Sequence, residues 1–290
     1  MGVKIKNGIF GKNWKKSGIY LNMKLHEEVL RIRELLGEEK EQKIFRVPGL
    51  EFFHENHWEA WQILQKVLER RGYPPYTIDG DLDLGGTPIQ SLGNLISVGG
   101  DLDLRKTAIE SLGNLQSVGG VLDLRGALIE SLGNLESVAH NVSLENTQIK
   151  SLGNLTSVGG NLFLGGTPIE SLGNLTSVGD DLDLRDTPIE SLGNLTSVGG
   201  DLDLYDTPIE SLGNLTSVDG YLDLRRTPIK SLGNLQSVGG YLDLINTPIE
   251  SLGNLQSVGD TLYLQVTPLS KMYTEEQIRE MVDVGGEIYL

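Results

Sequence analysis

Short runs of alternating apolar and polar residues recur through most of the chain, and residues 181–200, DLDLRDTPIESLGNLTSVGG, are a representative copy. Leu182 and Leu184 alternate with charged residues, which predicts a half-buried strand. Pro188 ends the strand, because proline has no N–H to give to a ladder. From position 189 to 198 the apolar residues stand three apart around a glycine, which favours turns or extended chain over a helix.

The same pattern returns every 20 residues, without insertion, in nine full copies that begin at residue 81. Such a period indicates a solenoid in which each coil packs on its neighbours. Gly199–Gly200 is expected to turn the chain toward the next strand, using backbone angles that glycine adopts at low cost. One coil should not fold alone, so we expect the coils to fold as a stack. The residues expected to face inward in the copy at 181 are Leu182, Leu184, Ile189, Leu192, Leu195 and Val198.

The segment LDLRDTPIESL, residues 182–192, resembles the leucine-rich repeat, whose core is LxLxxNxLxxL, with Thr187 where that family usually has asparagine. The resemblance covers 81–269. The repeat length is similar to that of bacterial leucine-rich effectors, and VGGDLDL is similar to the L-domain of some receptors. The resemblance implies a right-handed coil with one parallel β-sheet of about 11 strands and protein recognition by outward-pointing strand residues. It implies no chemistry.

The ends of the chain differ from the repeat, and we expect three parts. Residues 1–80 are predicted to be an α-helical (α+β) cap, 81–269 the solenoid, and 270–290 a C-terminal cap. The N-terminal cap should contain helices near 25–36 and 54–71, since apolar residues there stand at helical spacing.

The C-terminal cap is predicted to hold one helix and one strand. Thr274 and Gln277 have capping-box spacing within 273–282, which favours a short helix. VGGEIYL, residues 284–290, repeats VGGDLDL and predicts a last, eleventh strand. An open edge strand can pair with another chain, so a homodimer through this edge is a further hypothesis.

Two uncharged polar columns follow the repeat, and we interpret both as structural. Asparagine fills position 14 of all nine copies, counting each copy from residue 81 as position 1, and threonine fills position 7 except at Ala127. Amide and hydroxyl groups can satisfy turn backbone that apolar side chains cannot.

Charge and composition limit the function. Residues 1–80 carry a net charge of +3 and the remainder −19, giving −16 overall, which argues against binding nucleic acid or an anionic membrane. The chain has no cysteine and no apolar run of membrane-spanning length, so a cytoplasmic protein is expected. His54 and His57 in HENHW lack HExxH spacing and an evident third ligand. We therefore predict no metal site, no cofactor and no enzymatic activity.

Position 3 of the coils is mostly aspartate, and arginine often follows at position 5. These side chains should project from the strand face. An acidic platform for a basic partner, an inheritance from duplication without function, and binding of divalent cations by the aspartates all remain open. The charged residues assigned to the predicted binding face are Asp183, Asp203, Asp223, Asp243, Arg105, Arg185 and Arg225.

Aromatic departures from the repeat fall on the same face: Phe163, Tyr205, Tyr221, Tyr241 and Tyr263. Exposed aromatic residues beside charge are typical interface anchors. The alternative is packing between tyrosines of neighbouring strands.

From these patterns we predict a noncatalytic scaffold that binds another protein, with a basic surface, through the strand face of the solenoid. One alternative is an acidic nucleic-acid mimic that inhibits a nucleic-acid-binding protein. A second alternative is a secreted bacterial leucine-rich effector.

Overall fold

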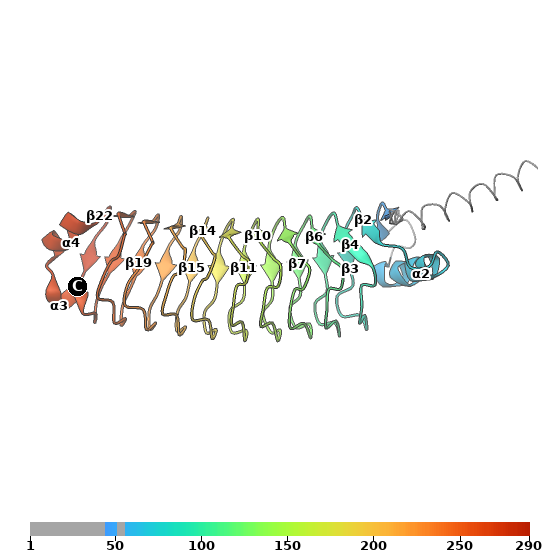
Figure 1. Ribbon diagram of the computed structural model, residues 1–290, viewed down its shortest axis with the longest axis horizontal. Helices are drawn as coiled ribbons and strands as arrows, with labels where there is room; N and C mark the ends of the chain where they lie inside the picture. Colours follow the sequence, from blue (N-terminus) through green and yellow to red (C-terminus); the bar gives the residue numbers. More distant parts are fainter. Residues whose placement is uncertain (1–43, 51–55) are drawn as a thin grey trace, which may run out of the picture. The chain divides into compact units, whose positions relative to one another are not determined.

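The computed structural model describes residues 44–50 and 56–290. Ile44–Leu290 form one compact unit, in which the coils stack side by side and two rows of short strands run along the stack (Figure 1). The predicted solenoid is confirmed. The helix predicted at 25–36 lies outside the described residues.

The predicted parallel sheet has 11 strands. It is built from positions 2 and 3 of each coil, where a buried aliphatic residue, usually leucine, is followed by an outward-pointing residue. Its strands are β3 Leu82–Asp83, β5 Leu102–Asp103, β7 Leu122–Asp123, β9 Val142–Ser143, β11 Leu162–Phe163, β13 Leu182–Asp183, β15 Leu202–Asp203, β17 Leu222–Asp223, β19 Leu242–Asp243, β21 Leu262–Tyr263 and β23 Ile288–Tyr289.

A second parallel sheet, of 12 strands, was not predicted. Most of its strands are Ser–Val pairs at positions 17 and 18, where one residue points out and one points in. They fall in the stretch that the spacing had assigned to turns or extended chain. The strands are β1 Phe45–Val47, β2 Tyr76–Ile78, β4 Leu95–Val98, β6 Ser117–Val118, β8 Ser137–Val138, β10 Ser157–Val158, β12 Ser177–Val178, β14 Ser197–Val198, β16 Ser217–Val218, β18 Ser237–Val238, β20 Ser257–Val258 and β22 Asp283–Val284.

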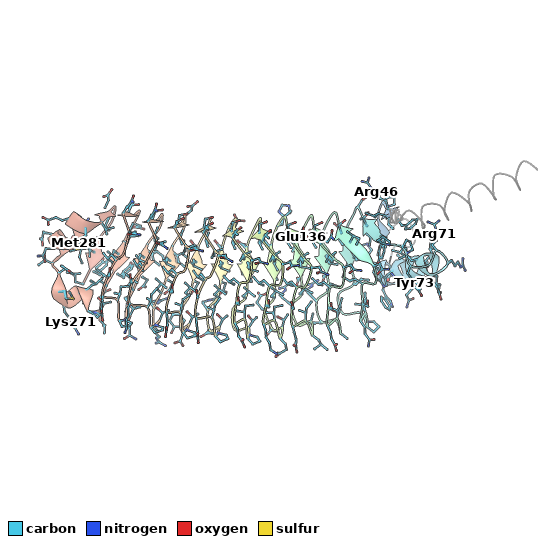
Figure 2. The ribbon with its side chains drawn as sticks, viewed as in Figure 1. Arg46, Arg71, Tyr73, Glu136, Lys271 and Met281 are labelled. Carbon is cyan, nitrogen blue, oxygen red and sulfur yellow. The ribbon has the colours of Figure 1, made fainter. Side chains whose placement is uncertain are left out.

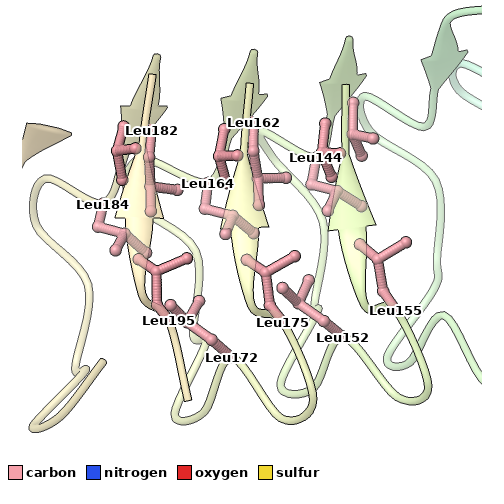
Figure 3. Packing of buried hydrophobic residues seen from close by; sticks show 14 of the residues in the cluster. Leu144, Leu152, Leu155, Leu162, Leu164, Leu172, Leu175, Leu182, Leu184 and Leu195 are labelled. Carbon is pink, nitrogen blue, oxygen red and sulfur yellow. The ribbon is translucent and has the colours of Figure 1, made fainter. Parts of the chain in front are cut away.

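The register places equivalent residues of successive coils against one another. Leu162 pairs with Leu182, and Val158 with Val178. Figure 3 shows equivalent leucines of successive coils, such as Leu164 and Leu184, aligned in rows inside the coils. All six inward positions predicted for the copy at 181 are buried. The core is therefore continuous along the stack, and each coil buries its apolar side chains against the next.

Glycine has two different uses in the coil. The expectation that Gly199–Gly200 supplies backbone angles special to glycine was wrong. Positive φ occurs at position 13, as in Gly193 at +58°, and at position 6, as in Asp186 at +55°. Gly199 and Gly200 are not among the residues with positive φ. A Cβ on Gly199 would lie 2.0 Å from the carbonyl oxygen of Gly179. The glycine pair thus permits close approach of neighbouring coils and does not supply a special backbone angle.

The two polar columns have the structural roles that the sequence suggested. Thr187 is buried, and its Oγ1 donates to the carbonyl oxygen of Leu184 at 2.7 Å. Asn194 Nδ2 donates to the carbonyl oxygen of Gly173 in the preceding coil at 3.3 Å. The threonine therefore closes the turn after the strand in the coils that have it, and this asparagine links neighbouring coils.

Helix α2, His57–Glu69, covers the first coil within the segment predicted to be helical. Asn56 caps it by accepting the N–H of Glu59 at 3.1 Å. Trp61 and Leu64 are buried in the common core. Residues 44–50 and 76–78 also add β1 and β2 to the 12-stranded sheet, so this end both caps and extends the solenoid.

At the other end, the last coil holds α3, Leu269–Met272, and α4, Glu275–Met281. The predicted capping box is present: Thr274 and Gln277 exchange side-chain and backbone hydrogen bonds. Leu262 pairs with Ile288 because these helices lengthen the coil before β23. Figure 2 shows Lys271 and Met281 at this end and Arg71 at the α2 end.

Candidate functional site

The outer face of the 11-stranded sheet carries positions 1, 3 and 5 of each coil, because positions 2 and 4 are buried leucines in nearly every coil. We use "outer face" for this surface. All of the predicted binding residues lie on it. Phe163, Tyr205, Tyr221, Tyr241 and Tyr263 are half-buried there.

Position 3 aspartates are hydrogen-bonded within their own coil. Asp183 Oδ1 accepts the backbone N–H of Arg185 at 3.1 Å and its Nε at 3.0 Å, while Oδ2 accepts Nη2 at 2.7 Å. Arg185 Nε also lies 3.3 Å from Asp203 Oδ2 in the next coil. Arg105 and Arg225 bridge neighbouring coils in the same way. Arginines of the same chain therefore neutralise part of the negative charge along this column.

Position 1 holds a second acidic column whose role the sequence did not reveal. Asp181 Oδ1 accepts the backbone N–H of Asp201 at 2.9 Å, and Asp201 Oδ1 accepts that of Tyr221 at 2.9 Å. Asn141 and Asn161 make the same bond to the following coil. Oxygen acceptors at this position therefore join successive coils, which gives the aspartates a structural reason to recur.

The position 3 carboxyls differ in pKa, because they differ in arginine pairing and in burial. Burial raises the pKa of Asp103, but hydrogen bonds from the side chain and backbone of Arg105 outweigh it, so the pKa lies below its ordinary value. For Asp203, burial dominates and the N–H of Tyr205 offsets it only in part, which raises the pKa to about 6. Burial likewise raises the pKa of Asp243.

Two of the predicted binding residues are not accessible in this structure. Asp223 is 2% exposed and Asp243 is 8% exposed. Arg225 Nε lies 2.9 Å from Asp223 Oδ2 and 3.4 Å from Asp243 Oδ2. These two carboxylates hold Arg225 in place. Asp183, Asp203 and the arginines at 105, 185 and 225 remain in contact with solvent.

The tyrosines form one continuous row toward the C-terminal end. The rings of Tyr221 and Tyr241 stack with centres 4.8 Å apart, and Tyr263 meets Tyr241 edge-on at 6.1 Å. Tyr289 stacks on Tyr263 at 5.3 Å. We call these four residues the tyrosine row. Tyr289 was missed, although VGGEIYL places it in the same repeat position as Tyr263.

Tyr205 is outside this row and contacts arginine. The guanidinium carbons of Arg225 and Arg226 each lie 5.2 Å from the centre of its ring. The alternative of packing between tyrosines of neighbouring coils is thus present in the structure, and the rings remain half-buried at the surface.

Concave features differ between the two sheets. A groove of about 740 Å³ follows the 12-stranded sheet and is lined mainly by Ser, Val and Gly of positions 17–19. It offers few charged groups and no aromatic side chains. On the outer face, a pocket of about 170 Å³ lies between Phe163 and Tyr221 and is lined by carboxylates. Charge and aromatic surface coincide only at the second of these two.

Metal-binding groups and membrane-spanning helices were sought in the part of the chain that the structure describes. Within residues 44–50 and 56–290, no group of three or more His, Asp or Glu is arranged to hold a metal ion. His57 is engaged structurally, because its Nδ1 accepts the N–H of Asp83 at 2.9 Å; His54 lies outside the described residues. No helix in these ranges has the length and apolar character to cross a bilayer.

Comparisons with protein-family models, curated proteins and solved structures found no match to this chain. The parallel-strand solenoid with regular 20-residue coils is established by the fold itself. The functional argument therefore depends on the chemistry of the outer face.

Proposed function

We propose that the chain is a short-repeat member of the leucine-rich-repeat class and binds another protein noncatalytically, through its outer face. The partner contacts the tyrosine row and presents a basic surface. The net charge of −19 after residue 80 favours such a partner.

One observation carries this proposal. At position 1 an oxygen acceptor normally joins successive coils, but Tyr221 and Tyr241 replace it. The exchange removes a structural hydrogen bond and places two amphipathic rings on the surface. Tyrosine is enriched among residues that dominate binding energy, because it buries a large area at low conformational cost.

The nucleic-acid mimic has weaker support. Double-stranded DNA carries one negative charge per about 1.7 Å of its axis. Positions 1 and 3 supply at most two carboxylates per strand spacing of about 4.8 Å. Arg105 and Arg185 reduce that density, and Asp223 and Asp243 are buried.

The predicted cytoplasmic location and homodimer stay predictions.

The proposal can be tested without a known partner by selecting binders from a library of short random peptides. Selected peptides should be rich in Lys and Arg. Their affinity should fall on the order of tenfold or more, equivalent to about 1.4 kcal/mol per tenfold, in Tyr241→Thr and Tyr263→Ser. These replacements copy Thr261 and Ser143, which occupy the same repeat positions.

Gln256→Ala is the control, since Gln256 is exposed beside the 12-stranded sheet. Calorimetry should show its affinity for the selected peptides unchanged. Peptides that bind the tyrosine variants as tightly as the unaltered protein, or that lack basic residues, would refute the proposal.

A further inference from the structure

A pocket on the outer face lies between two aromatic departures from the repeat. Phe163 belongs to β11 and Tyr221 precedes β17, so three strand spacings, roughly 14 Å, separate them. The strands between them contribute carboxylates from positions 1 and 3. Aspartate is ordinary at both positions. The two aromatic ends and the hollow are what distinguish this place from the rest of the outer face.

Charge inside the pocket is unbalanced. Asp181, Asp183, Asp201 and Asp203 line it, and Arg185 is the one basic residue in the lining. Arg185 already binds Asp183 on both oxygens and reaches Asp203 only at 3.3 Å. Tyr205 stands at position 5, where the second and third coils have arginine. The pocket therefore lacks one positive group that those coils supply for themselves.

The next coils show which group suits such surroundings. Arg225 is held between Asp223 and Asp243 and lies over the ring of Tyr205. A guanidinium there satisfies carboxylates at its edge and an aromatic ring at its face. The Phe163–Tyr221 pocket presents the same two kinds of surface to solvent, and the one arginine in its lining, Arg185, is already bound by Asp183.

The size of the pocket restricts its occupant. Sites for small molecules typically enclose about 300–1,000 Å³, whereas this pocket measures about 170 Å³. That volume suits the end of one side chain. A planar guanidinium can donate to carboxylates in a fork and stack on an aromatic ring, while an ammonium group is a compact and strongly hydrated point charge.

We propose that the Phe163–Tyr221 pocket receives one arginine side chain from a basic segment of a bound protein. This inference rests on the proposed function, because it specifies a contact made by that partner. The tyrosine row supplies the adjoining surface, and Tyr221 belongs to both.

The test is a titration of the full chain with the blocked peptide Gly-Gly-Arg-Gly-Gly, followed by NMR. Binding should saturate with a Kd on the order of 1 mM, as expected for one side chain. The same peptide with citrulline, which keeps the shape and lacks the charge, should bind at least tenfold more weakly. A lysine peptide should also be weaker.

Matched variants separate the pocket from general attraction. Asp203→Asn and Phe163→Ser should each weaken arginine binding severalfold. Asp103→Asn should not, although Asp103 occupies the same column and makes the same backbone bond. Equal binding of arginine and citrulline peptides, tighter binding of lysine, or equal loss in Asp103→Asn and Asp203→Asn would overturn the inference.

A further variant distinguishes this inference from the proposed function. Tyr263 neither lines the pocket nor stacks on Tyr221, so Tyr263→Ser should leave arginine-peptide binding unchanged while it weakens the library-selected peptides. Failure of the arginine titration alone would remove the pocket assignment and leave the tyrosine row standing. If the tyrosine variants bound the library-selected peptides normally and the arginine titration succeeded, the tyrosine row would lose its assignment and the pocket would keep its own.

Discussion

Replacing Asp203 by asparagine should stabilise the protein at neutral pH. Its pKa of about 6 is raised above the ordinary aspartate value of 3.8, chiefly by burial. Between these values the folded protein holds a proton that the unfolded chain has released. Stability is therefore lost as pH rises through this window, and the full penalty applies above pH 6.

The size of the effect follows from the shift. About two pKa units correspond to at most about 3 kcal/mol, at 1.36 kcal/mol per unit. Solvent reaches part of the carboxylate, so screening reduces the expected gain to about 1–2 kcal/mol. The substituted amide would keep an oxygen for the N–H of Tyr205, which now donates to Asp203 Oδ1 at 3.0 Å. Asp203→Asn should thus raise the free energy of unfolding at pH 8 and leave it unchanged near pH 4.

Urea denaturation followed by circular dichroism at both pH values measures this difference. Asp103→Asn is the matched control with the opposite sign. The pKa of Asp103 lies below its ordinary value, so its contribution to stability is present at pH 8 and is lost as pH falls through the folded pKa. Asp103→Asn should therefore destabilise at pH 8. Shifts of the same sign in both variants, or a gain in Asp203→Asn that does not depend on pH, would refute the electrostatic reasoning.

Two further predictions concern the backbone. Val266 is 68% exposed and has φ of +59°, so Val266→Asn should stabilise the protein by about 1 kcal/mol. Asn246→Val, at the same repeat position, should destabilise it by a similar amount. Equal urea midpoints for these variants and the unaltered protein would contradict this. Gly199→Ala should destabilise by about 1–3 kcal/mol through overpacking, because its Cβ would meet the carbonyl oxygen of Gly179. Ser197→Ala in the same coil should have little effect in the same assay, and equal losses would count against the close-approach explanation.

Periodicity made the solenoid predictable, because it specifies the inward positions independently of any single residue. The strand at Leu182 was identified from alternation, which requires several residues of pattern. The strand Ser197–Val198 contains one inward residue, so alternation is too short to detect there. Glycine was ambiguous for a different reason: Gly193 serves positive φ and Gly199 serves close approach, and both demands select the same amino acid.

Position 6 illustrates a conformation that appears in the residue types only when the coils are compared. Glycine, asparagine or aspartate, which adopt positive φ most readily, fills this position in seven of ten coils, and Lys106, Arg226 and Val266 have positive φ there too. The constraint comes from the turn that every coil must make. Sequence reasoning from a single coil could not detect it, since tertiary context overrides local preference.

The outward direction of the candidate residues followed from alternation, but their accessibility did not. Whether Asp223 is buried depends on side chains of the neighbouring coils and on Arg225. The pocket depends on relations across four strands, from Phe163 to Tyr221. A one-dimensional pattern specifies which face a residue joins, whereas depth on that face is set by neighbours from other coils.

The structural uses of aspartate change how the outer face should be interpreted. Because position 1 and position 3 carboxylates bind the backbone of this chain, their recurrence is explained without a partner. The departures then carry the functional argument. Phe163 and Tyr221, within four neighbouring strands, stand at positions where other coils have a carboxylate bound to backbone. Asp203 lies between them, and because burial raises its pKa, its charged form disfavours folding at neutral pH. A solvated face has no need for this combination, whereas a cationic side chain from a bound protein would satisfy the carboxylate and contact the aromatic rings together.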